Sequence, residues 1–146
     1  MALRFANVYG PRQNPHGEAG VIAIFAKRML AGEPVKINGT GKQTRDYVYV
    51  GDVVRALMLG MGKPSAAGPY HVGTGRETDV KTLYGKIAAL TGYGLKPQKG
   101  PADVGAPTRS ALDCRKVKRE LGWRPDVDLD EGLKRTVEWF REHANR

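Results

Sequence analysis

The stretch Arg45-Asp46-Tyr47-Val48-Tyr49-Val50-Gly51-Asp52 decides how the chain is interpreted. Its alternating aromatic and β-branched residues predict a short strand, and the apolar residues 53–59 that follow predict a helix with Asp52 as its N-cap. The glycine-rich residues 39–43 predict a turn that delivers Arg45 to the start of the strand. An arginine fixed in this way suits a phosphate or a carboxylate, because its guanidinium group offers two parallel donors.

Size and composition indicate one globular domain. The chain has 146 residues, enough for a single core and too few for two ordinary domains. No apolar run is long enough to span a bilayer, so we expect no membrane partner, and the N-terminus lacks the layout of a signal peptide. The single Cys114 has neither a disulfide partner nor a CxxC partner for zinc, so we expect no metal site and a cytoplasmic location.

The charge of the chain is strongly basic, with 24 Lys and Arg against 15 Asp and Glu, a net +9. Three interpretations follow: a nucleic-acid-binding surface, a site for a smaller polyanion such as a sugar diphosphate, or an ordinary solvated surface. The basic residues form no run of five or more, and aromatic residues are not interleaved with them. This pattern disfavours nucleic acid as a partner.

Short strands and helices are predicted along the rest of the chain. Residues 3–9 are mostly apolar with little alternation, which indicates a strand buried on both faces, as in a parallel sheet. Such a strand needs neighbours that this sequence scarcely provides, which suggests that a preceding segment is missing. Asp79 is predicted to cap a helix, and residues 95–110, which contain three prolines, are predicted to be irregular. Further strands are predicted at 35–38, 47–50 and 69–73, and helices at 21–31, 52–61, 80–90, 113–121 and 130–143.

Five segments, 3–13, 20–25, 39–53, 70–75 and 121–125, carry a set of motifs in a fixed order. Together they resemble the C-terminal part of the extended short-chain dehydrogenase family, the NAD-dependent nucleotide-sugar epimerases and dehydratases, with the UDP-glucose 4-epimerases as the most similar members. The resemblance implies an α/β fold. Residues 1–146 would be the C-terminal portion of a Rossmann-type protein, with a small mixed α/β substrate-binding subdomain.

The resemblance also implies a redox reaction that this chain does not perform alone. In that family NAD removes a hydride from C4 of the sugar ring and returns it, while a Tyr-x-x-x-Lys pair transfers protons. Neither the pair nor the glycine-rich NAD loop is present, since Gly73-Thr74-Gly75 lacks a third suitably spaced glycine and Lys96 follows Tyr93 one position too early. We therefore expect an absent N-terminal Rossmann half, no NAD bound to this chain alone, no catalytic residues and no activity.

A nucleotide-diphosphate sugar, most simply a UDP-sugar, is the ligand that the resemblance implies. Arg45 would bind the diphosphate, with an ion pair to Asp46 or Asp52 as the structural alternative. Asn7 would contact the sugar or diphosphate, or else satisfy loop backbone. The remaining site residues, which core packing or surface exposure would explain equally well, are Val21 and Ile22 at a helix start and Lys36, Ile37 and Asn38 along a strand edge.

Some residues near these motifs have ordinary structural explanations. Tyr47 and Tyr49 alternate with two valines, so we expect one of these pairs to face the core and the rings to serve packing. His16 and His71 have no partner constellation, and we expect them to be hydrogen-bonded or exposed.

One departure from the family pattern bears on the ligand. Where the family commonly shows Arg-x-Gly-Asp, this sequence places Asp103 at the arginine and Ala106 at the acid. A carboxylate beside a diphosphate repels it. Either Lys99 or Arg109 supplies the positive charge, or nucleotide affinity is weakened.

Three functional hypotheses stay open: half of a nucleotide-sugar epimerase, a non-catalytic nucleotide-sugar binding module, and a basic nucleic-acid-binding domain. In the first, residues 3–8 and 70–72 would be strands with unpaired edges. Such edges recruit other chains, so we expect self-association unless the missing half supplies the neighbouring strand.

Overall fold

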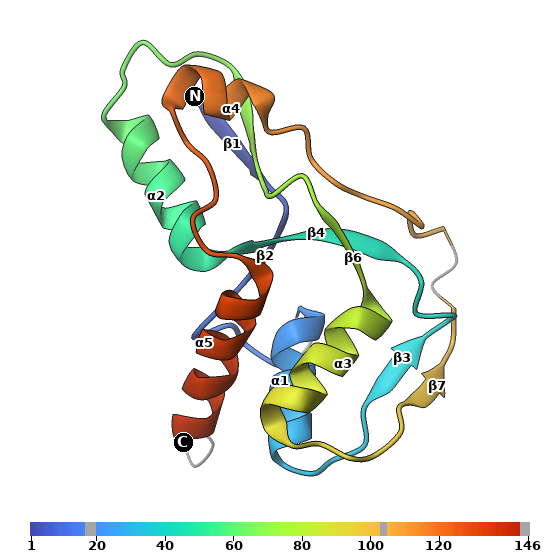
Figure 1. The fold of residues 1–146 in the computed structure, drawn as a ribbon. Helices are drawn as coiled ribbons and strands as arrows, with labels where there is room; N and C mark the ends of the chain where they lie inside the picture. Colours follow the sequence, from blue (N-terminus) through green and yellow to red (C-terminus); the bar gives the residue numbers. More distant parts are fainter. Residues whose placement is uncertain (17–19, 103–104, 144–146) are drawn as a thin grey trace.

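The computed structural model describes residues 1–16, 20–102 and 105–143. Within them, short strands and helices form a mixed α/β arrangement in which helices lie on both sides of a central strand (Figure 1). None of the described helices is long and apolar enough to cross a membrane. The strands are β1 (Ala2–Phe5), β2 (Asn7–Tyr9), β3 (Lys36–Asn38), β4 (Thr44–Tyr49), β5 (Pro69–Val72), β6 (Glu77–Asp79) and β7 (Gln98–Gly100), and the helices are α1 (Val21–Leu30), α2 (Val50–Met61), α3 (Val80–Thr91), α4 (Arg115–Leu121) and α5 (Leu129–Glu142).

The central strand is β4, which pairs in parallel with β2 and antiparallel with β6. Both of its faces are covered. Tyr47 and Tyr49 pack into a core formed with α1, α3 and α5, whereas Val48 packs into a second core with α2, α4 and β5. The tyrosine pair faces a core, as predicted for one of the two pairs, and tertiary contacts place a second core on the Val48 side as well.

The predicted strand at residues 3–9 is broken at Ala6 into β1 and β2. In the structure β1 pairs only with β5, in parallel, and both Arg4 and Phe5 are exposed. Burial on both faces was therefore a wrong expectation for β1, because the described residues give this strand a single neighbour. Within the described residues β1 and β5 form a two-stranded sheet in which each strand has one neighbour.

The helices follow the predictions closely, and so do β3 and β5, predicted at 35–38 and 69–73, whereas β6 and β7 were not predicted. Asp79 caps α3 as predicted, since its Oδ1 accepts from the Thr82 N–H at 2.8 Å. Helix α4 begins at Arg115 rather than at Asp113. The predicted irregular segment 95–110 contains β7, which pairs in parallel with β3. Both β6 and β7 are three residues long, too short to carry an alternating pattern in the sequence, and they form because a neighbouring strand offers hydrogen bonds.

Glycines allow close approach at two places in this fold. Gly41 in the turn before β4 has φ +69°, and an added Cβ would lie 2.7 Å from Ile37 Cγ2. Gly132 brings α5 against β2, because its Cβ would lie 2.0 Å from the hydroxyl of Tyr9. The β4 turn and the α5 contact therefore both require glycine.

The sequence predicted Asp52 as the N-cap of α2, and this prediction was wrong. The cap position is Tyr49, and Asp52 lies in the first turn with 2% exposure. Its carboxylate accepts from Arg55 Nη2 at 2.8 Å and from the backbone N–H groups of Asp126 and Val127 at 3.1 Å each. Asp52 therefore fastens α2 to the segment that precedes α5, a contact that sequence periodicity does not encode.

Asp46 has an equivalent role on β4. It is 2% exposed, and its two oxygens accept from the Thr74 N–H at 2.9 Å, the Thr74 hydroxyl at 2.6 Å, the Gly75 N–H at 2.9 Å and the Leu112 N–H at 3.3 Å. A buried carboxylate is tolerated when donors surround it in this way. Asp46 consequently holds the loop between β5 and β6, and the segment before α4, against β4.

We expect Asp52→Ala to lower the free energy of unfolding by about 3 kcal/mol, because Arg55 and two backbone amides would lose a buried acceptor. Urea denaturation followed by circular dichroism measures this. Asp130→Ala is the matched control: this carboxylate side chain is 72% exposed and pairs with Lys86 at 2.5 Å, so its loss should cost less than about 1 kcal/mol. Equal losses in the two variants would contradict the role given to Asp52.

Candidate functional site

The register of the three-stranded sheet gathers polar side chains on one face. Asn7 of β2 lies opposite Tyr47 of β4, and Arg45 of β4 lies opposite Thr78 of β6. Side chains alternate between the faces of a sheet, and directly paired residues share a face. Asn7, Arg45, Tyr47 and Thr78 therefore project from the same side. Two of the residues predicted from sequence, Asn7 and Arg45, are brought together there around a tyrosine.

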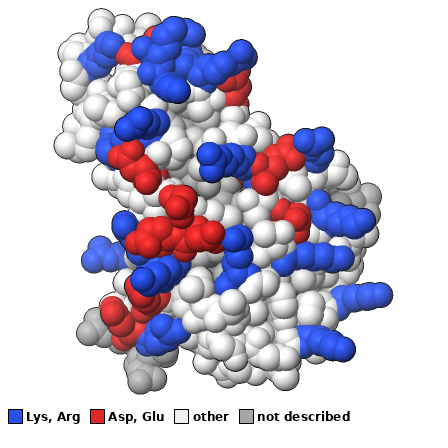
Figure 2. Space-filling view, in the orientation of Figure 1, with Lys and Arg blue, Asp and Glu red and all other residues white. Residues whose placement is uncertain are grey.

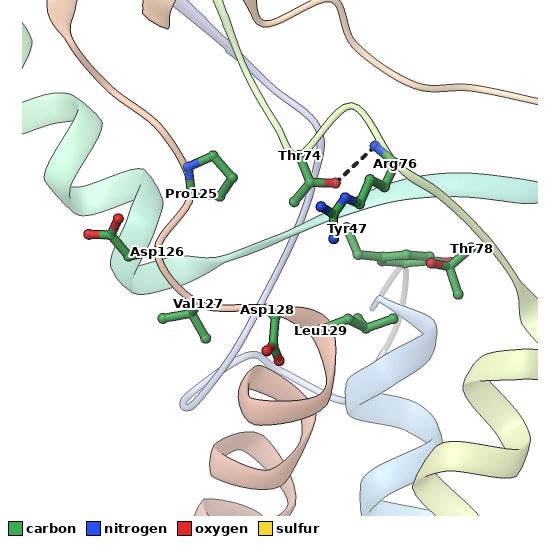
Figure 3. A pocket seen from close by; sticks show the side chains of 9 residues that line it. All are labelled: Tyr47, Thr74, Arg76, Thr78, Pro125, Asp126, Val127, Asp128 and Leu129. Atoms are coloured by element: carbon green, nitrogen blue, oxygen red, sulfur yellow. Dashed lines mark hydrogen bonds between the residues drawn. The ribbon is translucent and has the colours of Figure 1, made fainter.

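An open cavity of about 290 Å³ lies over this face, between β4, β6 and the start of α5 (Figure 3). Figure 3 shows the Arg76 side chain extending across the cavity toward the Tyr47 ring, with the first residues of α5 on the opposite side. No ion pair between described residues involves Arg76. The lining consists of Tyr47, Thr74, Arg76, Thr78, Pro125, Asp126, Val127, Asp128 and Leu129.

Arg45 is half-buried beside this cavity and makes no ion pair with either neighbouring acid. Its Nη1 donates to the carbonyl oxygens of Thr44 and Pro107, both at 2.8 Å. Asp46 and Asp52 are occupied by the partners described above, so the structural ion-pair alternative is wrong for both. The two hydrogen bonds fix the direction of the guanidinium group while using only one of its nitrogens.

Tyr47 is 8% exposed and contributes to both the core and the cavity lining. Burial raises the pKa of its phenol to about 12, against the opposing influence of the nearby Arg45 cation. The hydroxyl therefore stays protonated near neutral pH and can donate a hydrogen bond. Packing, the role that the sequence predicts for Tyr47, describes its ring and leaves out its position at the cavity.

Asn7 is exposed, and among the described residues its side chain makes no hydrogen bond to loop backbone. The alternative in which Asn7 satisfies the following loop therefore has no support. His16 accepts from the Lys27 ammonium group at 2.9 Å and is exposed, as expected, and His71 is half-buried on β5. Neither histidine lines the cavity over β4.

Of the predicted site residues at the start of α1 and along β3, the two isoleucines have buried side chains. Ile22 is 1% exposed and Ile37 7% exposed, and both belong to the core that contains Tyr47. Helix α1 has Gly20 at its N-cap and no acidic residue in its first turn, so no side chain there satisfies the first amides, and Val21 is half-buried against that core. Lys36 is exposed on β3.

The end of β3 and Arg45 meet a common segment. Asn38 is paired with Gly100 of β7, and the next residue, Gly39, donates its N–H to Pro101 O at 3.2 Å. The same segment, a few residues on, supplies the Pro107 carbonyl to Arg45. The structure thus places β3 and Arg45 at two ends of one loop, and Asn7 on the far strand of the sheet.

The departure from the family pattern falls partly outside the described residues. Asp103 lies outside them, and Ala106 is exposed. Arg109, one of the proposed substitutes, has its Nε 2.9 Å from Glu77 Oε2, and this contact holds the pKa of Glu77 below its usual range. The charge of Arg109 is thereby balanced, which leaves Arg76 as the cavity cation that the sequence analysis missed. Its signal was its position directly after Gly73-Thr74-Gly75.

Gly73-Thr74-Gly75 does not have the geometry of an NAD-binding loop. The N–H groups of Thr74 and Gly75 donate to Asp46, and the segment leads into β6, whereas a dinucleotide phosphate loop leads into a helix. NAD therefore does not fit these residues. Among the described residues, no group of three or more His, Cys, Asp or Glu side chains could hold a metal ion.

Comparison with known proteins identifies the family to which this fold belongs. Residues 1–73, half of the chain, match the NAD dependent epimerase/dehydratase family. The chain belongs to that family, and its mixed α/β fold matches the C-terminal part of epimerase structures.

Particular relatives are UDP-glucose 4-epimerases. The chain is 48% identical over 139 residues to the UDP-glucose 4-epimerase of Mycolicibacterium smegmatis, covering 95% of this chain and 44% of the relative. It superposes on the Thermotoga maritima UDP-glucose 4-epimerase, solved with UDP-glucose, with a TM-score of 0.91 and 52% identity, covering 97% and 45% of the two chains. For the Thermus thermophilus UDP-glucose 4-epimerase in complex with NAD, the TM-score is 0.85 and the identity 44%, covering 95% and 45%. The chain thus spans about half the length of these relatives.

Cys114 lies just outside the site and should be unreactive in the folded chain. Its thiol is half-buried and donates to Gly73 O at 3.3 Å. Burial, reinforced by the Asp46 carboxylate, raises its pKa to about 11. At pH 8 the thiolate, which is the reactive form, is then less abundant in the folded state than in the unfolded state. A pKa difference of about two units corresponds to a roughly 100-fold difference in thiolate population. Iodoacetamide labelling should therefore be at least about ten-fold slower in buffer than in urea. Similar rates in both would show that the thiol is not shielded.

Proposed function

We propose that this chain is the substrate-binding part of an NAD-dependent nucleotide-sugar epimerase, and that residues 1–146 bind a UDP-sugar on the Asn7–Arg45–Tyr47 face of the β2–β4–β6 sheet. The observation that carries the proposal is the strand register, which puts Asn7, Arg45 and Tyr47 on one face of the sheet, where Tyr47 and Thr78 line the cavity. The similarity to UDP-glucose 4-epimerases supports the choice of ligand.

The cations of the site suit a diphosphate, and the two carboxylates in the lining are already engaged, Asp126 with Arg55 at 3.0 Å and Asp128 with the Glu131 N–H at 2.9 Å. Arg45 and Arg76 are two guanidinium groups without a carboxylate partner among the described residues, and each can donate two parallel hydrogen bonds to phosphate oxygens. Arg76 would thereby replace the arginine that the family pattern places at position 103. The neutral Tyr47 hydroxyl can donate a further hydrogen bond, the Asn7 amide can contact sugar hydroxyls, and the first amides of α1 favour an anion.

The surface of the chain suggests where the rest of the enzyme would pack. Helix α2 exposes four apolar side chains at helical spacing, Val54 at 52%, Leu57 at 42%, Met58 at 64% and Met61 at 76%. Phe5 on β1, whose outer edge is unpaired, is 42% exposed. We propose that this apolar face and strand edge receive an NAD-binding half, which would also supply the proton-transfer pair. The chain covers only about 45% of its relatives, which supports a missing half of that kind.

Nucleic-acid binding receives no support from the face of the molecule shown in Figure 2. Acidic side chains interrupt the basic ones over that face, and no continuous basic stripe crosses it. A nucleic-acid site uses a basic patch or stripe aligned with the phosphate backbone. The net charge of +9 is therefore better explained by a solvated surface together with a small anion site.

Arg45→Ala should weaken binding of UDP about 10- to 100-fold, because a charge-assisted hydrogen-bonding group would be lost from the diphosphate. Arg45→Lys should retain part of the affinity, since it keeps the charge without the fork. Isothermal titration calorimetry at two salt concentrations measures both. Arg28→Ala is the control: this exposed arginine of α1 pairs with Glu33 at 3.3 Å, away from the cavity. Unchanged UDP affinity in Arg45→Ala, or binding of a short duplex that falls steeply with salt, would reject the proposal.

The purified chain with NAD should not convert UDP-galactose to UDP-glucose, and it should self-associate in light scattering.

Co-expression with the part of the Mycolicibacterium smegmatis relative that it does not span should give a complex with epimerase activity. Met58→Lys should prevent the complex, because a charge would have to be buried at the interface, whereas the exposed Lys134→Gln should not. Turnover by the isolated chain would refute the two-part organisation. A UDP-binding complex without turnover would favour a non-catalytic module.

A further inference from the structure

A second cavity, of about 570 Å³, lies away from the β4 face. It is formed by residues 12–16, the end of α1 and the end of α5, and it shares no residue with the cavity that Tyr47 lines. Its volume falls in the range of small-molecule sites. The side chains that matter for its chemistry are Arg12, Gln13, Lys27, Leu30, Trp139 and Phe140.

The charge of this cavity is positive. Arg12 and Lys27 line it, and no carboxylate does so among the described residues. Lys27 Nζ lies 2.9 Å from His16 Nε2, a contact that uses one of its three donors and leaves two for a ligand. Two cations lining one cavity match the charge of a phosphomonoester, about −1.5 to −2 at neutral pH.

Arg12 holds an unusual backbone conformation. With φ at +68°, it is the one non-glycine residue at positive φ among the described residues. An L-residue other than glycine is disfavoured there by roughly 1–2 kcal/mol. Glycine would remove that strain and would also remove the guanidinium group from the cavity. The presence of arginine at this position is therefore consistent with use of its side chain.

A rigid aromatic surface faces the same cavity. The Trp139 ring stacks on His143 with centroids 4.5 Å apart and meets Phe140 edge to face at 5.0 Å. Gln13 donates from Nε2 to Val8 O at 3.0 Å, while its Oε1 is buried and has no hydrogen-bond partner in the described structure. Because that oxygen is buried, the surface that the cavity offers to a ligand here is the aromatic one.

We propose that this cavity binds a small phosphomonoester carrying a planar ring, the chemistry of a mononucleotide. The phosphate would lie between Arg12 and Lys27, and the ring would lie against Trp139. This site is separate from the proposed UDP-sugar site and does not depend on it.

Adenosine monophosphate is the probe, and tryptophan fluorescence is the first readout. The chain has two tryptophans, of which Trp123 is fully buried and Trp139 lines the cavity. We expect saturable quenching by adenosine monophosphate that disappears in Trp139→Phe. Adenosine and inorganic phosphate, which each lack one half of the ligand, should bind at least about ten-fold more weakly.

Arg12→Gly is the decisive variant, because it removes the cation without straining the backbone. Its affinity for adenosine monophosphate should fall at least about ten-fold while its Tm is unchanged or higher. Lys134→Gln, an exposed lysine of α5 outside the cavity, should leave the affinity unchanged. Arg45→Ala should also leave it unchanged, so failure of this proposal and failure of the UDP proposal are distinguishable.

Three results would overturn the proposal. The first is that adenosine monophosphate produces no saturable change in the folded chain. Inorganic phosphate could bind as tightly as adenosine monophosphate, which would reduce the cavity to a simple anion site. Loss of binding in Arg45→Ala but not in Arg12→Gly would place the ligand on the β4 face instead.

Discussion

Two buried carboxylates hold this structure together around β4. Asp46 accepts hydrogen bonds from the N–H groups of Thr74, Gly75 and Leu112 and from the Thr74 hydroxyl. Asp52 accepts hydrogen bonds from Arg55 and from two backbone N–H groups before α5. Each joins segments that are far apart in the chain. Because a buried carboxylate is tolerated only when donors surround it, these contacts specify where the loops around the central strand must lie.

The same arrangement explains why β4 can present a binding face. Asp46 and Val48 point toward one core, so Arg45 and Tyr47 must point to the other side. There, α1, α3 and α5 cover Tyr49 and part of Tyr47, while the edge near Arg45 and Thr78 stays open beside the cavity. The polar face follows from the burial of the opposite face. The apolar face of α2 lies on the outside of the second core, so the proposed ligand surface and the proposed partner surface lie on opposite sides of β4.

The sequence predicted part of the candidate site. Arg45 and Asn7 follow from strand patterns and from the resemblance to the epimerase family, and the register of β2 with β4 accounts for their placement on one face. Arg76 was missed because β6, the strand next to it, is only three residues long and exists through pairing with β4. Ile22 and Ile37 were predicted at the ligand, but their side chains lie in the core. The sequence could not show this, because a residue's place in a family motif does not tell whether its side chain or its backbone faces the ligand.

By itself the sequence determined the family, the long helices and the central strand, because these depend on local periodicity, on caps such as Asp79 and on motifs that are continuous along the chain. Only the tertiary structure decided the roles of Asp46 and Asp52, the strands β6 and β7, the exposure of β1 and the cavity beside Trp139. Each of these joins residues many positions apart. Their energies come from hydrogen bonds and burial between segments, which no pattern within one segment records.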